Sequence, residues 1–372
     1  MRWFGRKSGR DGSRPALARG GAVVWREGGG ACGGWAQDYV GQLRAAYLDN
    51  PVAQRAVKTV AEGVAGAPLS GVEGAVRLVQ ARSAGQELLE TVAAHLLLHG
   101  NAYVQLIEDG AGGIGELYAL RPERVTIEAD ANGWPLAYRY RVGERVTAIP
   151  AETANGRPQL VHVRAFHPGD DHYGLGCLGA AAGAVAVHNA AAKWNKALLD
   201  NAARPSGALV YDPGDGAALS GDQFAKLRAE IDAAFAGAGN AGRPMLLDGG
   251  LKWQAMSLSP ADMDFAGLKA QAAREIALAF GVPPMLLGLP GDTGYANYRE
   301  ANRALWRQTI VPMGNRILGA LAQGLGPWIG EADMAIDLNR VTALAEERER
   351  LWRHVAAAAF LSDAEKRAML GV

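Results

Sequence analysis

The sequence predicts an α+β protein in which helices flank an antiparallel β unit and a smaller α/β insertion. Residues 100–163 alternate apolar and polar side chains with the period of strands, whereas the segments on either side have helical periodicity. An apolar helical run that includes Ile276 ends at Gly281, because Val282-Pro283-Pro284 cannot continue a helix. A glycine-rich loop then leads to a new helical pattern near Asn297.

Composition places the chain among folded proteins with two or three structural units, since its 372 residues are 49% hydrophobic and 20% charged. The 38 basic and 38 acidic side chains cancel. This excludes strong DNA binding by the whole surface, which usually needs a basic excess, but allows a surface past which DNA slides. Cys32 and Cys177 have neither disulfide nor zinc spacing, as is typical of a reducing cytoplasm.

The sequence shows neither a membrane-spanning segment nor a signal peptide. No apolar run approaches the ~20 residues of a membrane span, so no membrane partner is expected. Residues 1–36 are rich in Gly and Arg and lack the apolar core of a signal peptide, which predicts a flexible basic arm.

The first half after this arm is predicted to contain two helices and then five strands. Apolar side chains recur at helical spacing over 50–64 and 87–99. The expected strands are 101–107, 115–120, 124–128, 137–142 and 160–164. We expect the first two strands to pair, and Asn132-Gly133 to form a hairpin turn between the third and the fourth.

The second half is predicted to be mainly helical. Residues 179–203 are rich in Ala and free of Pro, which favours a long helix. A β-α-β-β insertion, 205–257, follows: a strand at 207–211, a helix at 220–236 capped by Ser220, and a hairpin of 244–248 with 251–257. A second helix runs from about 259 to 280.

Past the loop, a return helix is expected over 297–325, with a kink at Pro312. A further helix is expected over 339–359. Ser362 and Glu365 have the spacing of a capping box, which predicts a last short helix.

Gly174-x-Gly176-x-x-Gly179 matches the dinucleotide-binding fingerprint, with Asp200 further along the chain. The surrounding strands are predicted to be antiparallel, however, and the preceding strand ends near Arg164, too far for the tight turn that the fingerprint needs. The pattern therefore indicates the glycine-rich start of a helix, and a nucleotide-binding enzyme stays as an alternative.

A polar cluster precedes this motif, and all its members are of metal-ligating types: His162, His167, Asp170, Asp171 and His172. They lack the helical spacing of a metal site, so they indicate a polar loop. Phosphate-loop, GxSxG, HExxH and paired CxxC motifs are absent from the sequence. We therefore expect no catalysis, no metal and no cofactor.

The loop after Gly281 has the best candidates for a functional surface. It contains no His, Cys or Lys, so it is predicted to contact a partner without covalent chemistry. Its candidate residues are Asp292, Thr293, Tyr295, Asn297 and Tyr298.

Cations extend this surface along the return helix, at Arg299, Arg303 and Arg307. Aromatic stacking and Arg–phosphate contacts are ways of touching nucleic acid. A solvated helix face with core tyrosines fits the spacing equally well. The same two interpretations apply to basic residues of the helices predicted over 179–203 and 259–280, here called the inner helices. These residues are Lys193, Lys196, Lys269 and Arg274.

Seven segments, in order, resemble the phage portal (connector) family, in the branch of long-tailed phages, prophages and gene transfer agents. They are LLHGNAY (97–103), LYALRP (117–122), LVH (160–162), GAGNAGRPM (237–245), IALAFGVPPMLLG (276–288), IVP (310–312) and LSDAEKR (361–367). The resemblance covers about residues 50–372. One departure is Gly176-Cys177, where the family has Ser-Pro before the long helix.

The resemblance implies a portal-type subunit with a helical stem, an antiparallel β wing, a small α/β clip and a helical C-terminal crown. The implied regions are a flexible arm (1–36), the wing (37–178), stem helices (179–204 and 259–280), the clip (205–258), the tunnel loop (281–296), a long wing helix (297–330) and the crown (331–372).

The resemblance also implies a function. Portals form rings, usually of twelve subunits, at one capsid vertex, and double-stranded DNA passes through the channel during packaging and ejection. The implied partners are the major capsid protein, the terminase large subunit and a head–tail adaptor protein. Localisation would be the virion, after assembly in the bacterial host cytoplasm. Another virion ring or adaptor protein is the alternative.

The zero net charge of the chain would help DNA to move through such a channel. Each phosphate that a cation neutralises strengthens binding, so many free cations would trap DNA. We expect any Arg or Lys that faces the channel to be sparse or paired with a carboxylate.

Overall fold

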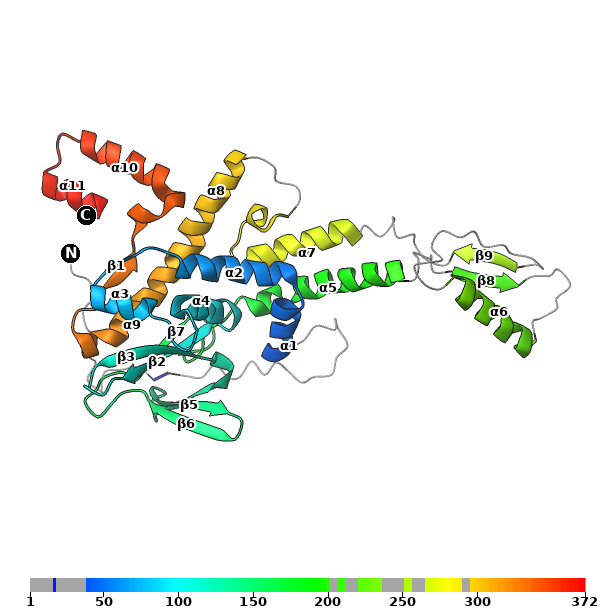
Figure 1. Cartoon of the computed structure of the whole chain (residues 1–372), viewed down its shortest axis with the longest axis horizontal. Helices are drawn as coiled ribbons and strands as arrows, with labels where there is room; N and C mark the ends of the chain where they lie inside the picture. Colours follow the sequence, from blue (N-terminus) through cyan, green and yellow to red (C-terminus); the bar gives the residue numbers. More distant parts are fainter. Residues whose placement is uncertain are drawn as a thin grey trace. The chain divides into compact units, whose positions relative to one another are not determined.

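The chain forms two compact units (Figure 1). The computed structural model describes residues 16–17, 38–200, 207–211, 220–235, 251–255, 265–289 and 295–371. The first unit comprises Met1–Ala182 and Ile276–Val372, and the second comprises Gly183–Glu275.

The first unit begins with a group of helices. They are α1 (Tyr39–Leu43), its π-helical continuation η2 (Arg44–Leu48), α2 (Pro51–Ala65), α3 (Glu73–Gln80) and α4 (Leu88–Leu98). The Asn50 side chain caps α2 by accepting hydrogen bonds from the N–H groups of Val52 and Ala53, both at 3.0 Å. α2 packs on α4 through buried small and branched side chains. The helices predicted over 50–64 and 87–99 are thus confirmed.

Two three-stranded antiparallel sheets follow. One has the order β3-β2-β7, formed by Ile114–Leu120, Asn101–Glu108 and Leu160–Arg164; the other has the order β4-β5-β6, formed by Val125–Ala129, Pro135–Val142 and Arg145–Pro150. A cluster of buried side chains from both sheets includes Tyr103, Ile127 and Tyr138. The five predicted strands, the pairing of β2 with β3 and the turn at Asn132-Gly133 are confirmed.

β6 was not predicted, because only one of its six side chains is buried and its apolar pattern is correspondingly weak. The short strand β1 (Leu69–Gly71) and α3 were not predicted either. β1 pairs with β10 (Met334–Ile336), more than 260 positions away, so its partner gives no local signal.

The long return helix is interrupted once. It consists of α8 (Tyr295–Leu305), a π-helical segment η6 (Trp306–Ile310) and α9 (Val311–Ile329). The expected irregularity at Pro312 takes the form of this π segment. Proline has no N–H for the carbonyl of Gln308 and clashes with it in a regular α-helix, and the wider π turn contains that residue. α9 buries Ile317, Leu321 and Leu325 and packs on α4 and β7.

The C-terminal part is less helical than expected. The predicted helix over 339–359 is wrong in its first six residues, which contribute to two 3₁₀ turns, η7 (Leu338–Arg340) and η8 (Thr342–Leu344), before α10 (Ala345–Ala357). Val341 and Leu344 are buried there, and Val341 is extended, so packing overrides helix propensity. The capping box of Ser362 and Glu365 is confirmed at α11 (Asp363–Leu370).

The second unit contains a hairpin and a helix between the distal parts of two long helices. α5 (Leu178–Asp200) crosses from the first unit into the second, and α7 (Phe265–Ala279) crosses back. Between them lie β8 (Gly207–Tyr211), α6 (Gly221–Phe235) and β9 (Leu251–Ala255).

β8 and β9 pair antiparallel, with Gly207 opposite Ala255. Ser220 caps α6 in a reciprocal pair with Gln223, as predicted. The predicted strand 244–248 lies outside the described residues. Among the helices of the described ranges, none combines the length and the hydrophobicity needed to cross a lipid bilayer.

Candidate functional site

The stop after α7 is built as the sequence indicates. Gly281 has φ +67°, which ends the helix, and the N–H of Val282 donates to the carbonyl of Ala277 at 2.9 Å. The Thr309 hydroxyl donates to the Gly281 carbonyl at 2.8 Å, which ties the return helix to this stop. The chain does not become a loop at once. A 3₁₀ turn, η5 (Pro284–Leu287), comes first, and Gly288 ends it with φ +72°.

Three of the five predicted loop residues lie in the part of the chain that the structure describes, and two do not. Asp292 and Thr293 lie outside the described residues. Tyr295 is the first residue of α8, and Asn297 and Tyr298 belong to its first turn. Asn297 is exposed and the Tyr298 side chain is 50% exposed, so Tyr298 is not a core tyrosine.

The four predicted basic residues of the inner helices all belong to the second unit. Lys193 and Lys196 are exposed on α5, whereas Lys269 and Arg274 are half-buried on α7. Burial, and then the charge of Lys269, lower the pKa of His188 on α5. Both effects favour the neutral form of His188.

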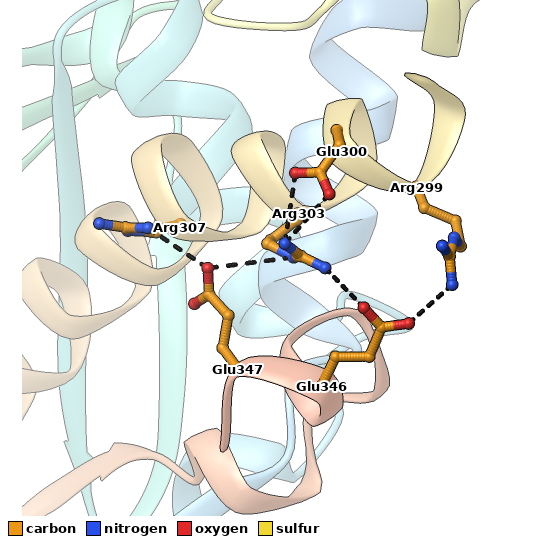
Figure 2. Close-up of polar contacts among 6 residues, drawn as sticks. All are labelled: Arg299, Glu300, Arg303, Arg307, Glu346 and Glu347. Carbon is orange, nitrogen blue, oxygen red and sulfur yellow. Dashed lines mark hydrogen bonds and ion pairs between the residues drawn. The ribbon is translucent and has the colours of Figure 1, made fainter. Parts of the chain in front are cut away.

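The three arginines after the loop face the first turn of α10 (Figure 2). Arg299, Arg303 and Arg307 are spaced at i, i+4 and i+8, so they lie on one face of the helix. Glu346 accepts from Arg299 Nη1 at 2.6 Å and from Arg303 Nη2 at 3.0 Å, and Glu347 accepts from Arg307 Nη1 at 3.3 Å. Together with Glu300, these residues are called the arginine ladder below.

Arg303 is the centre of the arginine ladder. Its side chain is only 15% exposed and lies within ion-pair distance of three carboxylates, those of Glu300 (3.1 Å), Glu346 (3.0 Å) and Glu347 (3.9 Å). Three arginines and three glutamates give the ladder a formal charge of zero. Each of the three arginines therefore has a carboxylate partner, and Arg303 is also shielded from solvent.

The glycines at 174 and 176 make a backbone-to-backbone contact with the end of α4 and the start of β2. A Cβ atom on Gly176 would lie 2.6 Å from the Leu98 carbonyl oxygen. The Gly174 N–H donates to Asn101 Oδ1 at 2.7 Å, and the Cys177 N–H donates to the Leu97 carbonyl at 2.8 Å. These N–H groups are used inside the protein, so the motif has the structural role that its context indicated.

Asn101 is the hub of this contact and is only 1% exposed. Its Nδ2 donates to the Gly174 carbonyl at 3.2 Å and lies 3.1 Å from His99 Nδ1, and its Oδ1 accepts from His162 Nε2 at 3.0 Å. The His162 ring also stacks on Tyr103, with ring centroids 4.4 Å apart. One amide thus joins the end of α4, β2, β7 and the segment that leads into α5.

Burial keeps the histidines around this hub neutral. It lowers the pKa of His162 to about 3, with a smaller contribution from Arg164, and the pKa of His99 to about 4. Burial, and then His99, lower the pKa of His95 to about 4. A neutral His99 ring can accept at Nδ1 from Asn101 Nδ2.

The other members of the polar cluster stabilise the loop before α5. The Asp170 carboxylate accepts from the N–H groups of His172 and Tyr173, and His172 Nε2 donates to the Gly133 carbonyl at 2.6 Å. His167 Nδ1 accepts from the Gly169 N–H. Within the described ranges, no three His, Cys, Asp or Glu side chains come together as a metal site would require.

Sequence reasoning missed Asn101, Glu346 and Glu347 as site residues. The acidic pair was visible as two glutamates in a predicted helix, opposite in charge to the arginine row, but the pairing spans 43 positions between Arg303 and Glu346. Asn101 was visible only as part of the LLHGNAY segment.

Comparison with known proteins identifies the family. The sequence model of the phage portal protein family matches residues 51–371, so the chain belongs to that family. It is a portal protein, a structural class without enzymatic activity, and the alternative of a nucleotide-binding enzyme is therefore wrong.

Solved structures agree with this assignment. A chain in the virion of a native gene transfer agent particle is 46% identical, with a TM-score of 0.70 over 92% of this chain and 96% of that one. A chain in the neck of the native particle, computed with C12 symmetry, is also 46% identical, with a TM-score of 0.70 over 94% and 98%. An HK97-family phage portal protein from Corynebacterium diphtheriae shares the fold at 17% identity, with a TM-score of 0.54 over 76% and 90%.

Curated relatives include an uncharacterized protein of Rickettsia bellii, 36% identical over 345 residues that cover 88% of each chain. The probable portal protein of Streptomyces phage phiC31 is 27% identical over 204 residues, which cover 54% of this chain and 43% of that one. The predicted mixture of helices and sheets in a portal fold is confirmed.

Proposed function

We propose that the chain forms a twelve-subunit ring at the neck of a gene transfer agent or phage-like particle, and that double-stranded DNA passes through this ring during packaging and ejection. The observation that carries the proposal is the 46% identity, over almost the whole chain, to a chain of a particle neck with C12 symmetry.

We propose a division of the chain into the regions of a portal subunit. We assign residues 37–178 and 297–330 to the wing, the helices 179–204 and 259–280 to the stem, 205–258 to the clip and 331–372 to the crown. The β8–β9 hairpin and α6, which lie within one compact unit, support a separate clip. The clip is the proposed docking surface for the terminase large subunit and a head–tail adaptor protein, and the wing for the major capsid protein.

Exposed apolar side chains of the first unit support assembly into a ring. Leu278 is 79% exposed and Phe360 is 87% exposed. Neighbouring copies of the chain can cover such groups, and full burial of one large apolar side chain contributes about 1.5–3 kcal/mol. A closed ring repeats each such contact at every interface.

The tunnel loop, 281–296, and the first turn of α8 are the proposed DNA-facing surface. The exposed Tyr298 supports this, because an aromatic side chain at the surface can contact DNA without reading its sequence. Asp292, Thr293, Tyr295 and Asn297 complete the proposed surface. The stem cations Lys193, Lys196, Lys269 and Arg274 are proposed as weak channel contacts, which keep DNA mobile because they are few.

Two experiments test the proposed function. Light scattering or negative-stain images should show ring particles with about twelve times the mass of the 39.1 kDa chain. A protein that stays strictly monomeric at high concentration would count against the ring.

The second experiment replaces both tyrosines, Y295A/Y298A. We expect intact rings but impaired packaging or retention of DNA, whereas Y295F/Y298F, which retains the rings and loses only the hydroxyls, should package normally. Full-length packaging by Y295A/Y298A would refute the role of the loop.

A further inference from the structure

We propose that the arginine ladder is a latch through which α8 and the C-terminal hairpin, α10 with α11, hold each other in place, so that a displacement of α8 is transmitted directly to the hairpin. The proposal goes beyond the conduit function. It concerns contacts within one subunit and does not depend on ring assembly.

The C-terminal hairpin is internally tied and can respond as one body. Arg348 of α10 donates through Nη2 to the Leu370 carbonyl of α11 at 2.7 Å, and through Nε to Asn339 Oδ1 at 2.7 Å. Lys366 of α11 donates to the Ala356 carbonyl of α10 at 3.4 Å. A force on the first turn of α10 therefore reaches α11 through side chains as well as through the connecting chain.

The apolar attachment of this hairpin is small. Val341 and Leu344 are buried just before α10, but Val355 is the one buried side chain of α10 itself. The polar contacts of the first turn of α10 with α8 and η6 thus form a large part of its attachment. These contacts are the ion pairs of the arginine ladder (Figure 2).

Arg303 gives the latch its strength. Exposed ion pairs contribute little, because solvent screens them and two flexible side chains must be ordered. Arg303 differs, since its side chain is largely buried and lies within ion-pair distance of three carboxylates, two of them on α10. Removal of its charge would leave Glu346 and Glu347 with only the exposed Arg299 and Arg307 as partners.

The position of the latch links the start of α8 directly to α10. α8 starts at Tyr295, immediately after the loop, and Arg299 and Arg303 lie one and two turns further along. Through the backbone, the loop and α10 are separated by all of α8, η6 and α9 and by the strand β10. The ladder bypasses this path. Coupling between two elements is reciprocal, so a change on either side must alter the other by the same factor.

Hydrogen exchange on the assembled full-length protein, followed by mass spectrometry, tests the latch from both sides. R303M keeps an unbranched stem but removes the charged guanidinium, and we expect exchange of the α10 amides to rise about fivefold. E346Q/E347Q should raise exchange of the second half of α8 by a similar factor. The triple variant should raise exchange by less than the product of the two separate effects, because R303M and E346Q/E347Q remove the same contacts between Arg303 and α10.

R353Q is the matched control. Arg353 pairs with Glu349 on α10 itself, and both side chains are exposed, so its loss should change neither helix. The β2 amides, which are remote from the ladder, report whether any variant has unfolded. R303K, which keeps the charge but loses the planar fork, should fall between wild type and R303M. Equal exchange of α10 in R303M and R353Q, or unchanged exchange of α8 in E346Q/E347Q, would overturn the latch.

Discussion

Replacement of Asn101 by Ala should destabilise the first unit more than any other single loss of a hydrogen-bonding side chain described above. Asn101 is fully buried and satisfies three other polar groups: the N–H of Gly174, the carbonyl of Gly174 and Nε2 of His162. Truncation leaves all three in a site that water does not reach.

The magnitude follows from the number of orphaned groups. Each buried donor or acceptor without a partner costs about 1–3 kcal/mol, so three groups cost at least about 3 kcal/mol. A domain has only about 5–15 kcal/mol of net stability, so N101A should lose a large part of it. Because two of the groups belong to Gly174, the segment that leads into α5 should loosen first.

Denaturant unfolding of N101A and wild type, with hydrogen exchange of the β2 amides as the local probe, measures this loss. N315A is the matched control: Asn315 Oδ1 accepts a single hydrogen bond, from the Ile336 N–H at 3.2 Å. We expect N315A to lose about 1 kcal/mol. If N101A loses no more than N315A, the hub does not hold the segment and the reasoning is refuted.

Three further outcomes are expected. The buried histidines His95, His99 and His162 have pKa values below their ordinary 6.5, so the unfolded chain binds more protons than the folded one. The unfolding free energy should therefore fall as the pH drops below 6.5, by about 2 kcal/mol per histidine at pH 5. Urea midpoints that do not change between pH 7.5 and pH 5 would contradict this. G176A should destabilise by about 1–3 kcal/mol in thermal or urea unfolding, because backbone atoms occupy the space of the new Cβ, whereas G319A, on an open face of α9, should be neutral or stabilising. F360S should leave subunit stability unchanged but raise the concentration needed for ring formation, measured by mass photometry; rings that form as in wild type would show that Phe360 is not at a subunit interface.

The elements that could be predicted are those whose local pattern coincides with their burial. α2 shows its buried face at helical spacing, and β2 is a mostly buried strand in the middle of its sheet. β6 lies at a sheet edge with one buried side chain, so it has no such pattern. The 3₁₀ turns before α10 depend on where Val341 and Leu344 pack, which no local rule specifies.

In the candidate site, too, features set by local sequence could be predicted and those set by long-range contacts could not. The stop at Gly281 and the start of α8 are set by proline and glycine, so the sequence was enough to locate them. The partners of the arginines were not predictable, because they are brought together by the fold of α9 and β10. Asn101 contacts Gly174 across 73 positions and His162 across 61, and the antiparallel register of β2 and β7 brings His162 close to it.

The π-helical segment Trp306–Ile310 has a consequence for chain length. A π turn accommodates one residue more than an α turn, while the helix on either side keeps its face. A single deletion within this segment can therefore revert it to an α-helix without rotating the buried side of α9 away from the sheet. The same deletion one turn later would turn every following side chain by about 100°. Where relatives of this chain differ by one residue along the return helix, we expect the difference to fall between Trp306 and Ile310.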